Sequence, residues 1–546
     1  MCSPGWAFAW EIWRGSRILL VLTLTYLLAL VLLVNVCPAG TLDPEVIAIL
    51  TIPLGCAGLP LWAVLSHTEH ADLMACESAY PRRAFTLPLR TVALASWPMT
   101  LGVAAVAPYW LAVAGLVLRP GGLPVPVLWP AVFVAALLAW GQVVMWLPLP
   151  LPGLRILVAV PVLGGMMTGA ALGSVYEVSP LMLLAVSAGL IPTGYLVAVV
   201  AVERARRGDT PVRSWPALLR RGATTAPPPF AAARAALFWL EWRRNGWTLP
   251  GLVLLILVSE LLLLALAGGS GRPDMQPDGF LAAFQAGVFL VSLVLFPTLL
   301  AGGAGASLGN GHPWSRKVST LPAFSAVRPV TSAAMIAVKL RVAARATLLT
   351  WGLAYLAILA LLPLSPAGVV LERWARQLID TQGLKGAVLL VLIVLGLPAL
   401  TGKEFISQLW LGLTGRPWVP MAMAVVFPVG LIAMTLVGQW ASNAEVEAAL
   451  LAAVPWGIGL ALLLKVGGGG LLAWALLRRG LVAPRTVLRF AGAWMVAAAV
   501  VFALCFWLVP PEVYSPLTAG GSAVLVLLPL VRLGLAPLAL DWNRHR

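Results

Sequence analysis

Charged side chains are scarce in this sequence, and their scarcity excludes a water-soluble fold. Only 10% of the 546 residues are charged, whereas 61% are hydrophobic and the mean hydropathy is +0.95. A soluble domain carries about 25% charged residues, and no core could bury the apolar surface that remains here. The chain also lacks the alternation of apolar and polar residues that marks transmembrane β-strands, because its apolar runs are continuous. We therefore expect an integral membrane protein built from helices.

Cysteine and histidine are few as well, which argues against a disulfide framework and against a metal centre. The five cysteines are scattered and include no Cys-x-x-Cys spacing, so they are expected to be small packing residues. The four histidines include His67 and His70, three residues apart, but two ligands without a third are a weak signal for a metal. A polar loop explains this pair better, and we predict no metal, no bound cofactor and no catalytic residue in the chain itself.

Long apolar runs fill most of the sequence and predict its fold class. A helix needs about 20 apolar residues to cross a bilayer. We predict an all-α polytopic transmembrane protein with about 14 membrane-spanning helices, with 12 as the alternative. The runs assigned as spans are 17–37, 46–65, 91–117, 128–148, 156–176, 179–202, 248–268, 280–303, 342–363, 386–402, 418–438, 448–474, 488–509 and 517–538.

The few charges are unevenly distributed, and this asymmetry predicts the orientation. The formal net charge is +16. With a cytoplasmic N-terminus, only five of the 36 Lys and Arg fall on the far side, namely Arg119, Arg272, Arg373, Arg376 and Lys385. This is the positive-inside distribution, so both termini are expected in the cytoplasm. The basic excess needs no nucleic-acid partner, since the chain contains no soluble basic module.

Two halves of the chain resemble each other across an Arg- and Pro-rich linker. A Trp-x-x-Trp-Arg motif precedes the first span at residues 10–14 and the seventh at residues 239–243, an offset of 229. Thr-Leu-Pro follows the second span of each half, at residues 86–88 and 320–322, an offset of 234. The shared order and similar offset predict two unequal repeats. We divide the chain into a first half at 1–202, a cytoplasmic linker at 203–236, a second half at 237–487, and two further spans with a basic tail at 488–546.

Tryptophans in front of each half are spaced for a helix at the membrane surface. Trp6, Trp10 and Trp13 fall on one helical face, and the second motif repeats the spacing. A helix with Trp on one side and Arg on the other lies in the interface between lipid and water. Simple anchoring beside a span would also explain either segment, but the repetition favours a shared mechanical role. The residues of these two helices are Trp10, Glu11, Trp13 and Arg14 in the first and Trp239, Glu241, Trp242, Arg243 and Arg244 in the second.

A cytoplasmic loop after the second span of each half carries paired cations beside apolar residues. In the first loop, at residues 81–90, we expect Phe85 and Leu87 to be exposed. An apolar knob surrounded by Arg is the composition of a protein interface. Orientation alone would explain the charges, but not the repeated Phe and Leu-Pro. The candidate docking residues are Arg82, Arg83, Phe85, Leu87 and Pro88 in the first loop and Arg316, Lys317, Leu321, Pro322 and Arg328 in the second.

These features resemble the membrane subunit of a type-2 ABC exporter. The resemblance rests on the helix before each half, the loop with Arg and Leu-Pro after the second span, and about six spans per half. It covers the N-terminal three or four spans of each half, roughly half of the chain. In that family the helix before the first span acts as an elbow, and the loop holds a coupling helix that seats in a groove on the ATPase. The resemblance implies a fused tandem of two half-permeases, with the residues just named as elbow and coupling elements. The two spans at 488–546 depart from the family pattern.

The sequence contains no ATP site of its own. It has no Gly-x-x-x-x-Gly-Lys-Ser/Thr segment, which is the loop that cradles nucleotide phosphates. The Gly-rich stretch 302–309 lacks the Lys and follows a span, so close helix packing and a loop are expected there. The resemblance therefore implies a separate cytoplasmic ABC ATPase that binds ATP and Mg, and a transport subunit rather than an enzyme. One copy holds both halves of the pathway, and a homodimer is a second possibility. The substrate is not specified.

Arg greatly outnumbers Lys, and Ala, Gly and Pro are plentiful. This composition is typical of a bacterium with a high-GC genome. We expect a multi-pass protein of the plasma (inner) membrane of a bacterium, in direct contact with the lipid bilayer.

Two other classes of membrane protein are alternatives. An ion-gradient-driven secondary transporter needs ionisable groups inside the bilayer; Glu260 is the one acid expected deep in a span, where a packing role is an equal alternative. Lys465 and Arg532 also lie in spans, and we expect them to reach toward the cytoplasmic interface. A membrane-embedded polyprenyl-linked glycosyltransferase-like enzyme would place acids in an external loop. Such acids are Asp43, Glu45, Asp274 and Asp278, for which ordinary solvated loops are the simpler explanation.

Two segments are predicted as short interfacial helices. Residues 370–381 place Leu371, Trp374 and Leu378 on one helical face, with charged residues around them. Residues 403–410 show a shorter pattern of the same kind. We expect the first helix on the outer side and the second on the inner side.

Overall fold

The chain is an all-α polytopic membrane protein, as the apolar runs predict. A computed structural model describes residues 4–36, 65–68, 76–151, 153–208, 232–268, 280–310, 331–416, 444–509 and 515–544, together with a few isolated positions between them. Every regular element in these ranges is a helix. Within the same ranges, 11 helical segments are long and apolar enough to cross a membrane, and Leu20–Asn35 is a shorter apolar helix.

Most of the predicted spans correspond to one of these segments. The predicted spans 46–65 and 418–438 lie largely outside the described residues, so the total of 14 stays a prediction. The described helices form two compact units, one ending before Pro229 and one beginning there. This boundary falls inside the segment 203–236 that the sequence marks as a linker.

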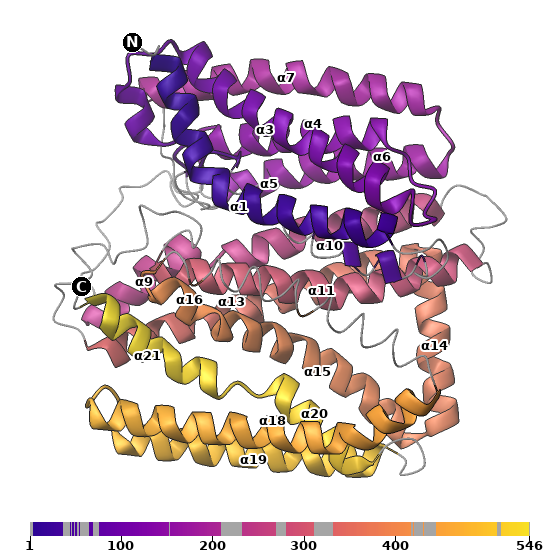
Figure 1. The fold of residues 1–546 in the computed structure, drawn as a ribbon, viewed down its shortest axis with the longest axis vertical. Helices are drawn as coiled ribbons and strands as arrows, with labels where there is room; N and C mark the ends of the chain where they lie inside the picture. The colour runs from indigo at the N-terminus through magenta and orange to yellow at the C-terminus, as the bar shows by residue number, and fades with distance from the viewer. Residues whose placement is uncertain are drawn as a thin grey trace, which may run out of the picture. The chain divides into compact units, whose positions relative to one another are not determined.

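Within the described residues, the first unit contains the Trp-rich N-terminal helix and four further spans. Its elements are α1 (Pro4–Val36), η1 (Arg82–Thr86), α3 (Thr91–Val113) with the π-helical turn η2 (Ala114–Leu118), α4 (Leu128–Trp146), α5 (Leu154–Ala159), η3 (Val160–Gly164), α6 (Gly165–Val175) and α7 (Pro180–Arg207). Helices α3, α4 and α7 pack side by side (Figure 1). Their contact is formed by buried residues of a single cluster, among them Leu94, Ala139, Trp146 and Ala198.

Helix α7 shows how local sequence sets the ends of a span. The hydroxyl of Ser179 accepts a hydrogen bond from the backbone N–H of Met182 at 3.2 Å, and Pro180 occupies the first turn, where its missing N–H is harmless. The helix ends at Gly208, whose φ of 75° is left-handed, a conformation that favours glycine. Three arginines in the last turn complement the negative end of the helix dipole.

The second unit contains the remaining spans. Its elements are α9 (Ala233–Asn245), α10 (Thr248–Gly268), α11 (Phe280–Asn310), α13 (Ser332–Leu361), η5 (Leu362–Leu364), α14 (Pro366–Gln382), α15 (Leu384–Ser407), α16 (Leu409–Leu413), α18 (Ala444–Arg478), α19 (Pro484–Leu508), α20 (Pro516–Leu527) and α21 (Val531–Arg544). The C-terminal helix α21 is part of this unit's core, because Ala536, Ala539 and Leu540 are buried with Leu249 and Leu413.

Glycines let helices α11 and α16 approach closely. A Cβ added to Gly309 would lie 2.5 Å from the Cα of Gly412, and one added to Gly305 would lie 2.2 Å from the carbonyl oxygen of Phe405. Real Cβ atoms are not found at such distances, so side chains here would force the helices apart. The close helix packing predicted for the Gly-rich stretch 302–309 is confirmed. The loop predicted there is wrong, because α11 continues through this stretch to Asn310.

The two predicted short helices have different outcomes. Helix α14 covers the predicted segment 370–381 and runs across the ends of α11 and α15 rather than along them (Figure 1). The segment 403–410 is not an interfacial helix, because it joins the end of α15 to α16 and buries Phe405 and Leu409 completely. Its apolar residues face other helices of the second unit, which a pattern of apolar side chains cannot distinguish from a lipid surface.

Candidate functional site

The described part of the first predicted loop is a folded surface rather than a loose connection. The short helix η1 begins after Pro81 and buries Ala84. Tyr80 is 1% exposed, and its hydroxyl donates to the carbonyl of Leu94 at the start of α3 at 2.8 Å. The Tyr80 ring stacks on Phe85 and meets Trp146 edge-on. Aromatic packing and one buried hydrogen bond therefore fix η1 on helices α3 and α4.

A buried arginine that the sequence analysis missed holds the same loop. Arg155, at the start of α5, is completely buried. Its guanidinium donates to the carbonyls of Glu77 at 2.7 Å and Val144 at 3.1 Å. Arg206 of α7 adds a hydrogen bond to the carbonyl of Leu89 at 2.9 Å. Because hydrogen bonds from a charged donor are strong, these two arginines tie both ends of the loop to the helices beneath it.

The outward face of the loop is basic, and its predicted apolar knob is absent. Phe85 and Leu87 are half-buried against the core of the first unit, so the expectation that both are exposed is wrong. The stack on Tyr80 turns Phe85 inward. Arg82 and Arg83 are exposed, at 71% and 55% of their side-chain surface, and Pro88 lies exposed beside them.

Helix α1 is linked to this loop by an ion pair. Arg83 in η1 lies 2.8 Å from the carboxylate of Glu11, and Arg82 pairs with Glu77. Trp10, Trp13 and Arg14 are exposed on α1. The helix runs without interruption from this Trp-rich segment into the apolar residues that follow, so the segment is the first part of a long helix rather than a separate one.

His67 lies beneath the Glu11–Arg83 pair. Its ring packs edge-on between Phe8 and Tyr80, with centroids 5.3 and 5.6 Å away. Burial lowers the pKa of His67 to about 4; the Glu11 carboxylate opposes this shift and Arg83 adds to it. His70, its predicted companion, lies outside the described residues, and the part of the chain that is described contains no group of three metal-ligating side chains.

The second Trp-rich segment forms the separate helix α9. Arg243 stacks over the ring of Trp239 at 5.3 Å, and Arg345 of α13 approaches the ring of Trp242 at 4.8 Å. Arg244 is exposed. The Arg345 contact holds one face of α9 against α13, whereas the Arg243 contact lies within α9.

A buried ion pair strengthens the attachment of α9. Glu241 lies 2.8 Å from the ammonium of Lys339 in α13, and the two side chains are only 16% and 4% exposed. The same ammonium donates to the carbonyl of Leu308 in α11 at 2.6 Å. One lysine therefore joins three helices. The loop residues Arg316, Lys317, Leu321, Pro322 and Arg328 lie outside the described part of the chain.

Glu260 lies within the span formed by α10 and packs against α11. Its two carboxylate oxygens accept a hydrogen bond from the hydroxyl of Ser292 at 2.7 and 2.6 Å. Pro297 and Trp351 border the same small space. A hydrogen-bonded acid between two packed helices agrees with the packing role that the sequence left as one alternative. The external-loop acids Asp43, Glu45, Asp274 and Asp278 fall on residues that the structure does not describe.

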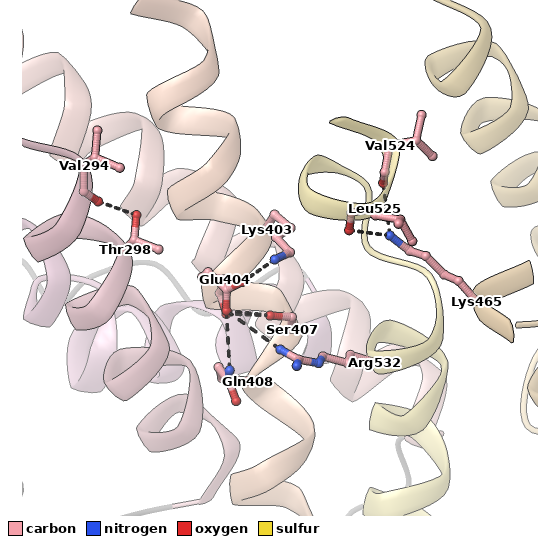
Figure 2. A network of polar contacts seen from close by, with 10 residues as sticks. All are labelled: Val294, Thr298, Lys403, Glu404, Ser407, Gln408, Lys465, Val524, Leu525 and Arg532. Atoms are coloured by element: carbon pink, nitrogen blue, oxygen red, sulfur yellow. Dashed lines mark hydrogen bonds and ion pairs between the residues drawn. The ribbon is translucent and has the colours of Figure 1, made fainter. Parts of the chain in front are cut away.

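A second polar group lies inside the spans of the second unit, around Glu404 of α15. Figure 2 shows Ser407, Gln408 and Arg532 directed at this carboxylate. Ser407 and Gln408 donate to it at 3.2 and 3.4 Å, and Lys403 pairs with it. Arg532 of α21 approaches to 4.0 Å. We call Lys403, Glu404, Lys465 and Arg532 the intramembrane cluster.

The last span is broken beside this cluster. Helix α20 ends at Leu527 and α21 begins at Val531, with Pro529 between them. The ammonium of Lys465 donates to the carbonyls of Val524 and Leu525 at 3.1 and 2.8 Å, at the end of α20 (Figure 2). Lys465 and Arg532 therefore have acceptors within the protein, at the end of α20 and at Glu404, and their reach toward the cytoplasmic interface stays a prediction.

Comparison with models of protein families, with curated proteins and with solved structures found no match to this chain.

Proposed function

We propose that this chain is the membrane subunit of an ABC exporter, driven by a separate cytoplasmic ATPase. The observation that carries the proposal is the direct link between helix α1 and the basic loop, made by Glu11 and Arg83 at 2.8 Å. A transport subunit of this kind needs a firm surface for its motor and a connection from that surface to a transmembrane helix. The loop 76–90 supplies the first, and the packing of Phe8 of α1 against Tyr80 in one buried cluster, with the ion pair beside it, supplies the second.

The surface is rigid enough to transmit a displacement. Tyr80, Arg155 and Arg206 fix the loop to α3, α5 and α7, so a partner that moves the loop also moves the ends of these helices. Arg82 and Arg83 are exposed and would attract an acidic groove. Motion of the partner on ATP binding would then change the tilt of the helices, and the bound state would favour one of two packed arrangements.

The alternatives receive less support from the same contacts. A transporter driven by protons or sodium ions needs acids that can bind a cation. Among the described acids in the spans of the second unit, Glu260 binds Ser292, and Glu404 already pairs with Lys403. The basic excess around Glu404 would repel an entering cation. The acids on which a glycosyltransferase-like enzyme would depend, Asp43, Glu45, Asp274 and Asp278, fall on residues that the structure does not describe, so that alternative has its sequence support alone.

Co-purification tests the proposal. The full chain, tagged and extracted in mild detergent, should retain an ATPase that bears a nucleotide-binding P-loop. Reversing the charges with R82E and R83E should reduce the recovered ATPase about tenfold, because charged contacts to a partner contribute about 1.5–3 kcal/mol. The matched control is R485E with R489E, two exposed arginines on α19.

The outcomes separate the classes of function. Loss of the ATPase from R82E/R83E but not from the control supports the coupling assignment. Equal recovery from both variants would contradict it. Isolation of the chain alone, with transport driven by an ion gradient in vesicles, would reject the ABC assignment as a whole.

A further inference from the structure

Basic side chains outnumber acidic ones in the middle of the second unit's spans. Lys465 is the central residue of the span Ala452–Arg478, and Arg532 lies within two residues of the centre of Leu517–Arg544. Charges at this depth are costly and, in proteins that keep them, mark ligand or ion pathways. The intramembrane cluster contains three cations and the single acid Glu404, and Lys403 and Arg532 lie close enough to Lys465 to act on its charge.

The contacts within the intramembrane cluster do not neutralise its excess of positive charge. Glu404 pairs with Lys403, and one carboxylate offsets one positive charge. Lys465 is held by the carbonyls of Val524 and Leu525, which are neutral acceptors. Among the described residues, the cluster therefore retains two positive charges, on Lys465 and Arg532.

The guanidinium of Arg532 still has donors to offer. Its approach to Glu404, at 4.0 Å, is longer than a hydrogen bond. The side chain is 52% exposed, so the surrounding helices do not enclose it. A guanidinium carries five N–H donors in a planar fork that matches the oxygens of a phosphate.

The donors of Lys465 and Arg532 lie beside the break between α20 and α21. Interrupted transmembrane helices are found where the chain lines a ligand site or cavity. Pro529 lies in the interruption and has no N–H to donate. Helix α18 exposes Leu464 and Val466, the two chain neighbours of Lys465; successive residues turn by about 100° around a helix, so apolar side chains flank the lysine on both sides.

We propose that Lys465 and Arg532 bind the phosphate of an anionic, lipid-like amphiphile within the membrane. The two positive charges and the guanidinium fork select the phosphate, and the apolar surface of α18 accommodates its hydrocarbon chain. As a statement about the substrate of the exporter, this inference rests on the proposed function. The binding site itself does not depend on the ATPase.

Lipid binding to the purified full-length chain tests the site. Native mass spectrometry in a neutral detergent compares dioleoyl phosphatidylglycerol with dioleoyl phosphatidylcholine, which has the same chains and no net charge. The unmodified chain should prefer phosphatidylglycerol. R532Q and K465Q should each weaken phosphatidylglycerol binding about tenfold, in line with loss of a charged hydrogen-bonding partner. R489Q, which removes an exposed arginine on α19, should bind as the unmodified chain does.

A variant that is expected to bind the lipid more tightly keeps the test valid if R532Q and K465Q fold poorly. E404Q removes the single acid and should tighten phosphatidylglycerol binding severalfold, an effect that damage to the fold would not produce. R532K and K465R keep the charge and should bind within about threefold of the unmodified chain. The proposal would be overturned if the unmodified chain bound the two lipids equally. It would also be overturned if R532Q, K465Q and E404Q all bound phosphatidylglycerol as the unmodified chain does.

Competition distinguishes the sources of the phosphate. Millimolar inorganic phosphate should leave the lipid bound, since it has no chain to occupy the apolar surface. If inorganic phosphate displaced the bound lipid at the same concentration as a competing lipid does, the assignment of an amphiphilic ligand would be wrong and the ligand would be a free anion. The ATPase co-purification is independent of both assays. If the chain selects phosphatidylglycerol but no ATPase co-purifies, the ABC exporter assignment is refuted and the lipid site is retained. If an ATPase co-purifies but the chain shows no lipid selectivity, only the lipid site is refuted.

Discussion

Replacing Lys339 by Met would leave the Glu241 carboxylate without its cation in the interior of the second unit. Lys339 is 4% exposed on its side chain and also donates to the carbonyl of Leu308. Removing one partner of a buried ion pair costs about 3–5 kcal/mol, because the remaining charge stays desolvated. Glu241 is 16% exposed, which admits some water, so we expect the lower end of this range, about 3 kcal/mol.

The loss should be visible as a lower melting temperature. The second unit has about 300 residues, and unfolding entropy is about 2.1 cal/mol/K per residue, so about 3 kcal/mol corresponds to a shift of roughly 5 °C. The assay is the thermal midpoint of folded protein in detergent, followed by size-exclusion chromatography of heated samples. K385M is the matched control, since Lys385 is exposed at the start of α15.

A double variant shows whether the unpaired charge of Glu241 causes the loss of stability. K339M combined with E241L removes both charges, and such replacements are often neutral. Its midpoint should recover to within about 2 °C of the unmodified chain. A single variant that melts within about 2 °C of the control, or a double variant as unstable as K339M, would refute the reasoning.

The remaining predictions concern two titratable groups. Burial lowers the pKa of His67 to about 4, whereas an unfolded histidine titrates near 6.5, so the unfolded chain binds the proton first as the pH falls. Stability of the first unit should be complete above about pH 6.5 and decline by about 3 kcal/mol toward pH 4; H67F should remove this part of the dependence in melts recorded between pH 7.5 and 4.5. E260Q keeps an acceptor for Ser292, so transport in vesicles should change less than about twofold; abolished transport would instead support the ion-driven alternative.

The spans could be predicted because their apolar runs are long and uninterrupted. The helix α7, for example, contains the whole predicted run 179–202 except its cap residue, and continues to Arg207. The extra turn is polar because it extends beyond the apolar run, and apolar patterning carries no information on where a helix ends in water. Its end is set instead by the left-handed Gly208.

The break in the last span was not predictable, since proline inside a transmembrane run is ambiguous. Pro98, Pro108 and Pro192 all lie within continuous helices, whereas the helix is interrupted around Pro529. Neighbouring helices decide which outcome holds, because they supply donors for the freed carbonyls. Lys465 supplies that donor here, some 60 residues earlier in the chain.

The direction of side chains in the first loop also depended on distant partners. The local sequence placed Phe85 between charged and polar residues, which suggested exposure. Tyr80 and Trp146 provide an aromatic surface for it, and Trp146 comes from a different helix. Arg155 gave a weaker signal still, because one arginine after a Pro-rich turn looks like an ordinary flanking charge.

The two Trp-rich helices use their single acid differently, and a shift of one residue accounts for it. Glu11 follows Trp10 directly, whereas Glu241 stands two residues after Trp239. Successive residues turn by about 100° around a helix, so the two acids point to different sides relative to their tryptophans. Glu11 reaches Arg83 on the surface, and Glu241 reaches the buried Lys339.

This difference fits the motion that the proposed function requires. An exposed ion pair contributes about 0–1 kcal/mol, so the Glu11–Arg83 link can break and form again at little cost as the loop moves. The buried Glu241–Lys339 pair costs about 3–5 kcal/mol to break and holds α9 to α13 throughout. The repeated motif therefore supplies one adjustable connection in the first unit and one fixed connection in the second.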